Sequence, residues 1–406
     1  MKKVFMQFGS GLGPMSRSLP IALELAKNGF EVRYLGYSSA KKYMEKAGIK
    51  EIDSIFSISD ITKGVPNPHW NTADTFWTMI GYGNMPWLET KIEQLIKIVK
   101  DYNPDYIFSD LGILACLVAR ILNIPLIAMN QSCYYPTNKL KWWTNVEYDE
   151  NELRDKLNDF LAKHNAKKLN TFTEIFTGDL TVIPSFYDFD KISEEGLNKY
   201  NGTYIGPILW FSDKHVDENI SNILSKNNNR KKIFCYTARF TDNVGKSGEV
   251  IFDSVFSVAK DIDADFVIST GNKQDYDKAL SKVNNIPSNV YITDYVPLEV
   301  AYENSDIVIH HGGHGSCLAQ FYFNKPGLII PTHSEREHNA RVCKKLGVSE
   351  FLERENLSDK NIQDKISMLF ANKKYKENIE KINKENLGIF NNFEVFIEKV
   401  KNLECK

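Results

Sequence analysis

Short apolar runs alternate with stretches of helical periodicity along most of this 406-residue chain. The first run, Val4–Phe8, precedes a glycine-rich loop and an apolar-periodic helix, and Glu31–Leu35 then returns as a second strand. The order recurs with a strand over Asp105–Ser109, a helix over Leu111–Leu122 and a strand over Leu126–Met129. Such repeated units bury parallel strands in one sheet between two layers of helices. The sequence therefore predicts an α/β protein.

A second series of units follows a polar stretch that ends near Lys232. The strands predicted in this half are 233–237, 265–269, 290–293, 306–310 and 327–330. Because a single hydrophobic core stops growing at roughly 250–300 residues, we expect two doubly wound domains, over 1–205 and 206–384. Residues 385–406 have apolar side chains at helical spacing, which predicts an amphipathic helix that packs back on the first domain.

Composition excludes several classes of partner. Fifty basic and 52 acidic residues leave a formal charge of −2, so no nucleic-acid partner is expected. Six scattered cysteines without a CxxC pair predict reduced, buried thiols and no zinc site. The apolar run at the start is too short for a signal peptide, and no run of about 20 apolar residues occurs. These features predict a cytoplasmic protein.

The segment Ile309–Ser316 carries the strongest candidate site. An apolar strand ends there, glycines permit a tight turn, and a helix begins. Backbone N–H groups at a helix start, together with the helix dipole, bind phosphate groups, and His311 is placed to donate to a phosphate oxygen. Two alternatives are a plain turn capped by histidines and a zinc site formed by His310, His311 and His314.

A second candidate site, Pro331–Arg341, also follows a predicted strand and begins a helix. Its Glu335 carboxylate is suited to accept two hydrogen bonds from sugar hydroxyls. The alternative is a solvated helix start whose acidic residues are stabilised by the helix dipole.

Taken together, these segments resemble the nucleotide-sugar lobe of family 1 glycosyltransferases, including bacterial macrolide and antibiotic sugar transferases. Asn289–Pro297, His311–Ser316 and Pro331–Ala340 carry the resemblance in that order. The first half is similar to the same family through Gly11–Arg17 and Pro104–Asp110. The resemblance implies the GT-B fold, in which two Rossmann-like domains face each other across a cleft. It also implies an inverting transferase that uses a UDP- or dTDP-sugar as co-substrate, without a cofactor or metal.

In the resembled family an aromatic side chain stacks on the base, which falls on Tyr295, and the next backbone group pairs with the base. Arg336 stands where glutamine is commoner, and Ala319 stands where many members carry a ribose-binding side chain, with Gln320 adjacent. The donor-binding residues implied by the resemblance are Thr237, Tyr295, Val296, His311, Gly313, Gly315, Ser316, Gln320, Glu335 and Arg336.

The catalytic base must differ from that of most family members, because Pro14 stands where they carry the histidine that deprotonates the acceptor. Three side chains are candidate substitutes: Asp110, His69 and Glu335. We predict Asp110 as the base, with His69 as the second catalytic candidate. The alternative for Asp110 is a helix N-cap, and the alternative for His69 is an exposed loop residue.

Aromatic residues crowd the non-strand segments of the first half and predict an apolar or aromatic small-molecule acceptor. The alternative is that about half of these aromatic side chains close the core of the first domain instead of lining an acceptor pocket. The acceptor-binding candidates are Gly11, Leu12, Pro14, Trp70, Trp77 and Trp87. A helical flap is expected over 139–170, where Lys141 precedes Trp142 and Trp143; this pattern leaves peripheral membrane contact and a membrane-lipid acceptor as alternatives.

Two further functions stay open. A noncatalytic partner would retain the nucleotide-binding fold without the histidine that Pro14 replaces. A nucleotide-sugar 2-epimerase fits less well, because its site needs no large aromatic acceptor pocket. The Asp-x-Asp pairs, beginning at Asp188, Asp261, Asp263 and Asp275, are interpreted as solvated turns and helix ends rather than as a metal site.

Overall fold

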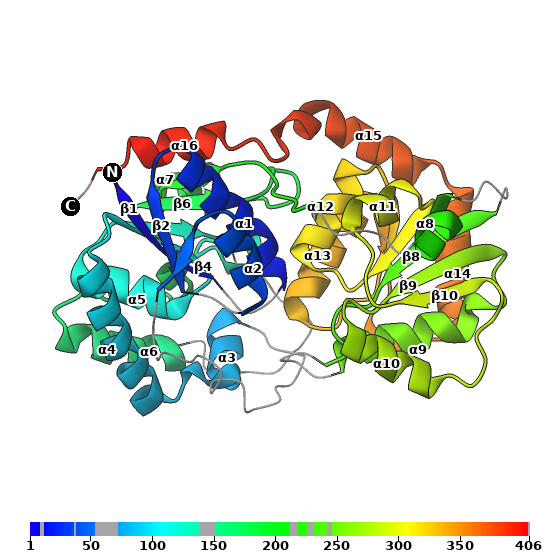
Figure 1. Cartoon of the computed structure of the whole chain (residues 1–406), viewed down its shortest axis with the longest axis horizontal. Helices are drawn as coiled ribbons and strands as arrows, with labels where there is room; N and C mark the ends of the chain where they lie inside the picture. Colours follow the sequence, from blue (N-terminus) through cyan, green and yellow to red (C-terminus); the bar gives the residue numbers. More distant parts are fainter. Residues whose placement is uncertain are drawn as a thin grey trace. The chain divides into compact units, whose positions relative to one another are not determined.

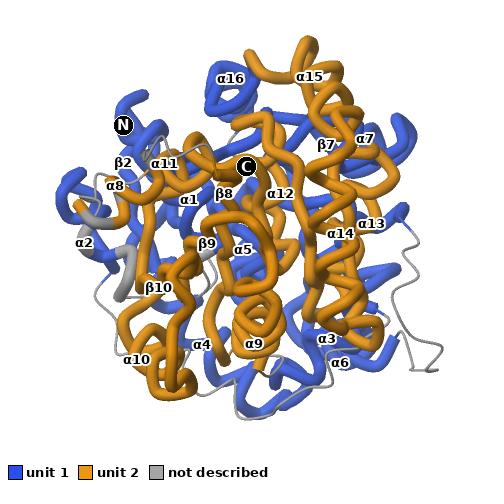
Figure 2. Tube along the Cα trace, turned by 90° about the vertical axis from the view of Figure 1, so that its right-hand side faces the viewer, with its two compact units in different colours: residues 1–65, 70–210, 389–406 blue, residues 66–69, 211–388 orange. Residues whose placement is uncertain are grey.

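The computed structural model describes residues 1–8, 12–35, 38–52, 72–138, 151–211, 218–225, 230–241 and 246–404 (Figure 1). These residues form two compact units, coloured separately in Figure 2. Unit 1 contains the described residues up to Trp210 and those from Ile389 onward. Unit 2 contains the described residues between Phe211 and Gly388.

Unit 1 is built on a parallel sheet with the strand order β3-β2-β1-β4-β5-β6-β7. Its strands are β1 (Lys3–Phe8), β2 (Glu31–Leu35), β3 (Lys50–Glu51), β4 (Tyr106–Asp110), β5 (Leu126–Met129), β6 (Leu180–Ile183) and β7 (Gly202–Tyr204). Its α-helices are α1 (Leu12–Lys27), α2 (Ser38–Lys46), α3 (Ala73–Trp77), α4 (Met85–Tyr102), α5 (Ile113–Leu122), α6 (Glu152–Lys163), α7 (Glu194–Lys199) and α16 (Glu394–Lys401). The π-helical turn η1 (Thr78–Tyr82) and the 3₁₀ turns η2 (Ser132–Tyr134) and η3 (Phe172–Phe176) complete the described elements of this unit.

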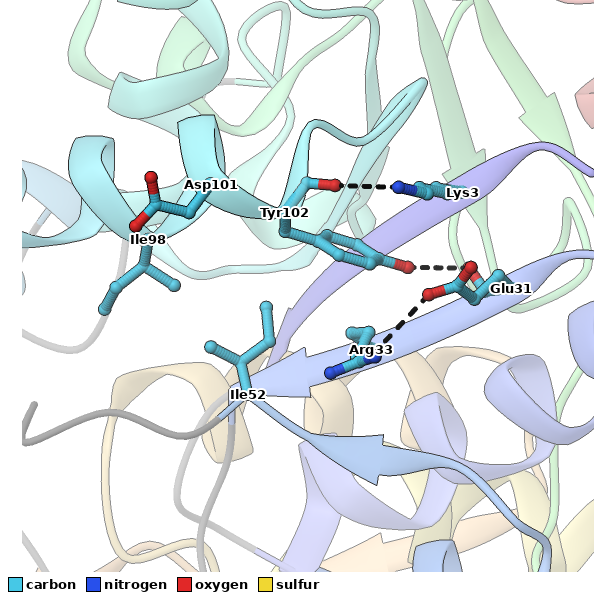
Figure 3. Close-up of a pocket in the computed structure, with 7 residues that line it drawn as sticks. All are labelled: Lys3, Glu31, Arg33, Ile52, Ile98, Asp101 and Tyr102. Carbon is cyan, nitrogen blue, oxygen red and sulfur yellow. Dashed lines mark hydrogen bonds and ion pairs between the residues drawn. The ribbon is translucent and has the colours of Figure 1, made fainter.

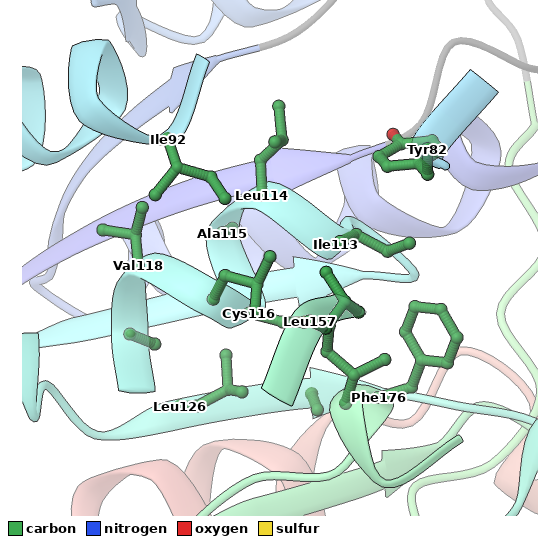
Figure 4. Close-up of a cluster of buried hydrophobic side chains, with 14 of the residues drawn as sticks. Tyr82, Ile92, Ile113, Leu114, Ala115, Cys116, Val118, Leu126, Leu157 and Phe176 are labelled. Atoms are coloured by element: carbon green, nitrogen blue, oxygen red, sulfur yellow. The ribbon is translucent and has the colours of Figure 1, made fainter. Parts of the chain in front are cut away.

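Both faces of this sheet are buried, which explains why its central strands have no polar alternation. Ile107 of β4 lies in the core beneath α4, α5 and α6, part of which is drawn in Figure 4. Its neighbour Phe108 points to the opposite face and packs edge-on against Phe396 of α16, with ring centroids 6.4 Å apart. The last helix of the chain therefore closes the core of the first unit.

Unit 2 repeats the plan with the strand order β10-β9-β8-β11-β12-β13, again all parallel. Its strands are β8 (Lys231–Tyr236), β9 (Ala264–Ser269), β10 (Val290–Thr293), β11 (Ile307–His310), β12 (Gly327–Ile329) and β13 (Ser349–Phe351). Its helices are α8 (Glu218–Ser225), α9 (Ser247–Ala259), α10 (Lys273–Lys282), α11 (Leu298–Glu303), α12 (His314–Tyr322), α13 (Ser334–Lys345), α14 (Asp359–Ala371) and α15 (Lys374–Asn386), with the 3₁₀ turn η4 (Arg354–Asn356).

The predicted strands are present in both units, with ends shifted by one or two residues, and the GT-B type of fold is confirmed. Four strands were not predicted: β6 and the short edge strands β3, β7 and β13. Runs of two or three residues, as in the edge strands, carry no readable period.

The prediction of one C-terminal helix is wrong in detail. Helix α15 ends at Asn386, a 3₁₀ turn follows over Leu387–Ile389, and Asn391 takes a left-handed φ of 53° before α16. An Asn residue tolerates this conformation because its short polar side chain bonds locally. The Asn391 side chain also accepts the Leu209 N–H at 2.8 Å, which fixes the point where the chain re-enters unit 1.

The five cysteines within the described residues are free and buried, as expected. No helix in these ranges is long and apolar enough to cross a bilayer. Of the predicted flap, residues 139–150 lie outside the described ranges, and α6 forms most of the rest.

Candidate functional site

The central feature of unit 2 is the carboxyl edge of its sheet between β8 and β11. Strand β8 pairs with β9 on one side and with β11 on the other. The chain therefore leaves β8 toward one edge of the sheet, to β9, and leaves β11 toward the opposite edge, to β12. In open parallel sheets ligands bind at such a switch point, beyond the carboxyl ends of the strands. Apart from Gln320, which stands in the second half of α12, the predicted donor residues belong to loops or helix starts at or near this edge.

The glycine loop leaves β11 in a conformation that requires glycine. Gly312 has φ +85°, and a Cβ atom there would lie 2.7 Å from the Arg336 carbonyl oxygen. The Gly312 carbonyl accepts a 2.9 Å hydrogen bond from Asn339 Nδ2, which ties the loop to α13. Helix α12 begins at His314, directly after its N-cap residue Gly313, and has no side-chain cap. Apart from the adjacent residues and the helix's own backbone, no described atom lies within 4 Å of a Cβ added at Gly315. The loop thus leaves open space beside the first turn of α12.

His311 lies across this loop and is 9% exposed. Its ring packs edge-on against Tyr236, with centroids 5.6 Å apart, and its Nε2 would lie 2.5 Å from a Cβ added at Gly313. Its Nδ1 has no hydrogen-bond partner among the described residues. Burial, and then the positive charge of Arg336, hold the pKa of His311 well below its ordinary value. The imidazole is therefore neutral at pH 7 and able to donate one hydrogen bond.

The first turn of α13 brings a second set of groups to the same edge. Arg336 donates to the Thr332 hydroxyl, and its charge acts on both His311 and His333. His333 is 7% exposed, and burial followed by the Arg336 charge lowers its pKa strongly as well. Glu335, the predicted sugar-binding carboxylate, is half-buried in the same turn. One permanent cation and two neutral imidazoles therefore share this edge.

Tyr295 follows β10 and is half-buried. Burial raises the pKa of the Tyr236 phenol, and Tyr295 adds a smaller increase. Gly271, with φ +82°, lies against the Tyr236 ring: a Cβ added at Gly271 would lie 3.3 Å from Tyr236 Cε2. Tyr236 thus packs against His311, and its pKa responds to Tyr295, the predicted base-binding residue.

Two predicted donor residues face the interior instead. Gln320 is fully buried, and its amide group bonds to His310, Ser349 and the Lys325 carbonyl. Thr237 is also fully buried, and its hydroxyl donates to backbone carbonyls. Because neither side chain reaches the surface, we leave Gln320 and the Thr237 hydroxyl out of the proposed donor site.

At the matching edge of unit 1, Asp110 ends β4 beside the last residue of β1. Its two carboxylate oxygens accept from Arg17 Nε and Nη2, both at 2.7 Å, and Ser18 donates to it at 3.1 Å. The Asp110 side chain is 0% exposed and that of Arg17 is 10% exposed. Both oxygens are therefore engaged by a buried arginine rather than open to an acceptor hydroxyl.

The alternative role for Asp110, as a helix N-cap, is wrong. Helix α5 begins at Ile113 with Gly112 as its N-cap residue. The N–H groups near its start are satisfied by Gln7 Oε1, which accepts from Ala115 at 2.7 Å, and by the Ser109 hydroxyl, which accepts from Gly112 at 3.0 Å. The neighbouring strand β1 supplies the cap that the local sequence lacks.

Of the other predicted residues in the first half of the chain, His69, Trp70 and Gly11 lie outside the described residues. Leu12 and Pro14 stand in the first turn of α1. Trp77 and Trp87 are half-buried and join an edge-to-face series with Tyr82, with ring centroids 5.2 and 6.1 Å from it. Both indoles pack against the core drawn in Figure 4, so much of their surface is structural.

Two of the Asp-x-Asp residues are not solvated. Asp190 is buried and accepts from the Ser132 N–H and hydroxyl, and Asp265 is buried beside Arg230. Among the described residues, no group of three or more His, Cys, Asp and Glu side chains is placed to hold a metal ion.

Two cavities lined by described residues of unit 1 lie away from this chemistry. One of about 400 Å³ is lined by Lys3, Glu31 and Tyr102 near the amino ends of β1 and β2 (Figure 3). A second, of about 570 Å³, includes Leu126 and Asn201 at the amino ends of β5 and β7. We give more weight to the carboxyl edges, where connecting loops and helix N-termini converge.

Sequence reasoning missed Arg17, Tyr236, His333 and Asn339 as members of these edges. His333 and Asn339 stand inside the predicted second loop, so their proximity in sequence to Glu335 was an available signal. Arg17 lies 93 residues from its partner Asp110, and no local pattern reports such a pairing.

Comparison with known proteins agrees with this geometry. Residues 1–174 match the family model "Glycosyl transferase family 1", and residues 253–401 match "Erythromycin biosynthesis protein CIII-like, C-terminal domain". A Methanosarcina mazei protein described as "Uncharacterized glycosyltransferase" is 27% identical over 391 residues, covering 91% of this chain and 93% of the relative. A Bacillus subtilis protein, "Uncharacterized UDP-glucosyltransferase YojK", is 24% identical and covers 70% of this chain and 69% of its own length.

Solved structures show the same fold. The spinosyn rhamnosyltransferase SpnG has a TM-score of 0.73 at 14% identity and covers 99% of this chain and 100% of its own. The glycosyltransferase VinC, solved with dTDP, has a TM-score of 0.71 at 18% identity and covers 98% of both chains. Family models thus match most of both halves of the chain, and the chain is a glycosyltransferase with the GT-B fold, similar to those of the macrolide and antibiotic type.

Proposed function

We propose that this glycosyltransferase moves a sugar from a nucleoside diphosphate sugar, with uridine or thymidine as the nucleoside, to a hydroxyl of an apolar or aromatic small molecule, with inversion and without a metal. The observation that carries the donor half is the convergence of an uncapped helix start, His311 and Arg336 at one sheet edge. Solved relatives support it, since SpnG was solved with thymidine diphosphate and with spinosyn aglycone.

The diphosphate would lie against the N–H groups of Gly315 and Ser316, where no described side chain occupies the space next to Gly315. His311 would donate one hydrogen bond to it, and Arg336 would offset its charge. The leaving diphosphate gains negative charge as the glycosidic bond breaks, so these groups stabilise the transition state more than the ground state. A helix start and a guanidinium together supply the role that a divalent cation plays elsewhere.

Tyr295 would stack on the base, with the Val296 backbone pairing to its edge, and Glu335 would accept hydrogen bonds from the transferred sugar. Tyr295 and Glu335 are each half-buried, which leaves surface for contact. Gly313 would allow the close approach of the backbone.

For the acceptor proton, Asp110 and His69 remain the proposed candidates. Arg17 holds both oxygens of Asp110, so direct proton transfer would require Arg17 to release one of them. This pairing supports a positioning role for Asp110, in which it holds the start of α1 and Pro14 in place. Trp77 and Trp87 would contribute only their exposed parts to an acceptor surface, together with Leu12, Pro14 and the segments that hold Gly11 and Trp70.

The test is mass-spectrometric detection of transfer from a panel of UDP- and dTDP-sugars to pooled phenolic, macrolide and lipid acceptors. His311→Ala and Glu335→Ala should each lower turnover at least 100-fold, a typical loss for removing one transition-state contact. Glu377→Ala, which removes another first-turn glutamate of unit 2 in α15, is the matched control and should retain activity. Equal turnover by all variants would contradict the donor site.

A noncatalytic nucleotide-binding partner is the second candidate, favoured by Pro14 and by the occupied Asp110. Tight nucleotide binding without turnover across the panel would establish it. Transfer confined to the lipid acceptors would instead identify a membrane-lipid glycosyltransferase.

A further inference from the structure

His310, the last residue of β11, is fully buried between the sheet and the glycine loop. Its Nδ1 accepts the Gly312 N–H at 3.0 Å, and its Nε2 lies 3.0 Å from Gln320 Oε1. Because Nδ1 acts as an acceptor, the ring proton must be on Nε2, where it is donated to Gln320. One neutral tautomer satisfies both contacts.

The next contacts in the chain of hydrogen bonds fix this tautomer. Gln320 Nε2 donates to the Lys325 carbonyl at 3.2 Å and to the Ser349 hydroxyl at 2.9 Å. A carbonyl oxygen cannot donate, so the amide nitrogen must face Lys325 and the amide oxygen must face His310. The network therefore runs from β13 through α12 to the ring of His310, with each donor matched to an acceptor.

Gly312, at the far end of the network, is held on three sides. His310 accepts from its N–H, Asn339 donates to its carbonyl oxygen, and the Arg336 carbonyl oxygen would lie 2.7 Å from a Cβ added to it. The next residues are Gly313 and the first turn of α12, whose N–H groups we assign to the diphosphate. The direction of those groups depends on the conformation of Gly312.

We propose that His310 is a positioning residue for donor binding: by accepting the Gly312 N–H it fixes the glycine turn that presents His311 and the start of α12 to the diphosphate. The inference rests on the proposed donor site and adds a residue that does not touch the ligand. A buried apolar residue at 310 would fill the space but leave the Gly312 N–H without its acceptor, and Gln320 Oε1 would keep only the Ser349 hydroxyl as a donor. The network requires an acceptor at the position of Nδ1.

Two variants separate the two ring nitrogens. In His310→Asn the side-chain oxygen can occupy the place of Nδ1 and accept from Gly312, whereas in His310→Gln the amide reaches the place of Nε2. Binding of UDP and dTDP is measured by calorimetry at pH 7.5, with thermal unfolding of each variant measured in parallel. We expect His310→Asn to bind within about threefold of wild type and His310→Gln to bind at least tenfold more weakly, which corresponds to about 1.4 kcal/mol.

His164→Gln, which makes the same change at the end of α6 in unit 1, is the control and should leave nucleotide affinity unchanged. If the wild-type protein binds neither nucleotide, the proposed function fails. If wild type binds and folded His310→Gln binds equally well, the proposed role of His310 fails while the donor site stands.

A measurement on the wild-type protein keeps the inference testable if both variants unfold. Long-range proton–nitrogen correlation of the histidine rings reports which nitrogen carries the proton. We expect His310 to be protonated on Nε2 alone at pH 7.5. A proton on Nδ1 would overturn the assignment, because that nitrogen could not accept from Gly312.

Discussion

Replacing Asp110 by asparagine should lower the free energy of unfolding of unit 1 by about 3–5 kcal/mol, the usual cost of removing one member of a buried ion pair. The pair is bidentate, with both contacts to Arg17 at 2.7 Å and a further bond from Ser18 at 3.1 Å. The variant leaves the guanidinium of Arg17 buried without its counter-charge. Arg17→Met should cost a similar amount, because it leaves the carboxylate of Asp110 unpaired.

The double variant Arg17→Met with Asp110→Leu removes both charges and should cost no more than either single variant. The expected coupling energy is about 3 kcal/mol, the upper end of the range for contacting residues. All six tryptophans lie between Trp70 and Trp210, within unit 1, so tryptophan fluorescence during urea unfolding follows this unit separately. Additive costs, or single-variant costs below about 1 kcal/mol, would refute the reasoning from burial. A stable but inactive Asp110→Asn would move the assignment back toward proton transfer.

Three further outcomes are expected. Burial lowers the pKa of His310 to about 4, so below pH 6.5 the unfolded state binds more protons than the folded state. The free energy of unfolding should therefore fall by roughly 3 kcal/mol as the pH drops from 6.5 to 4. Unfolding followed by circular dichroism should show a smaller loss of stability over this pH range for His310→Asn. Glu350→Gln should destabilise unit 2 by about 2–4 kcal/mol in urea, because it removes the buried carboxylate that binds the partly exposed Lys344 and Lys365; a cost below 1 kcal/mol would contradict this. Leu111→Gly should stabilise unit 1 by about 1 kcal/mol in the same assay, since φ is 54° there; a variant less stable than wild type would contradict this.

Local sequence was sufficient for the elements whose signal is local. The strand ending at His310, the glycines after it and the helix of which Ser316 is an early residue were each predictable from periodicity and from the φ that glycine permits. The order of these units along the chain was enough to give two doubly wound sheets. The same segments carried the family resemblance, and so the transferase activity class.

The tertiary structure decided which polar side chains face a ligand and which face the core. Gln320 looked like a ribose contact beside Ala319, but the helix turns it inward to His310 and Ser349. Asp110 looked like a free base or a cap, but α1 brings Arg17 to it across 93 residues. Trp77 and Trp87 joined the core for the same reason. The residue type determines what a side chain is able to bind. Its actual partner depends on which distant elements the packed sheet brings within about 3 Å of it.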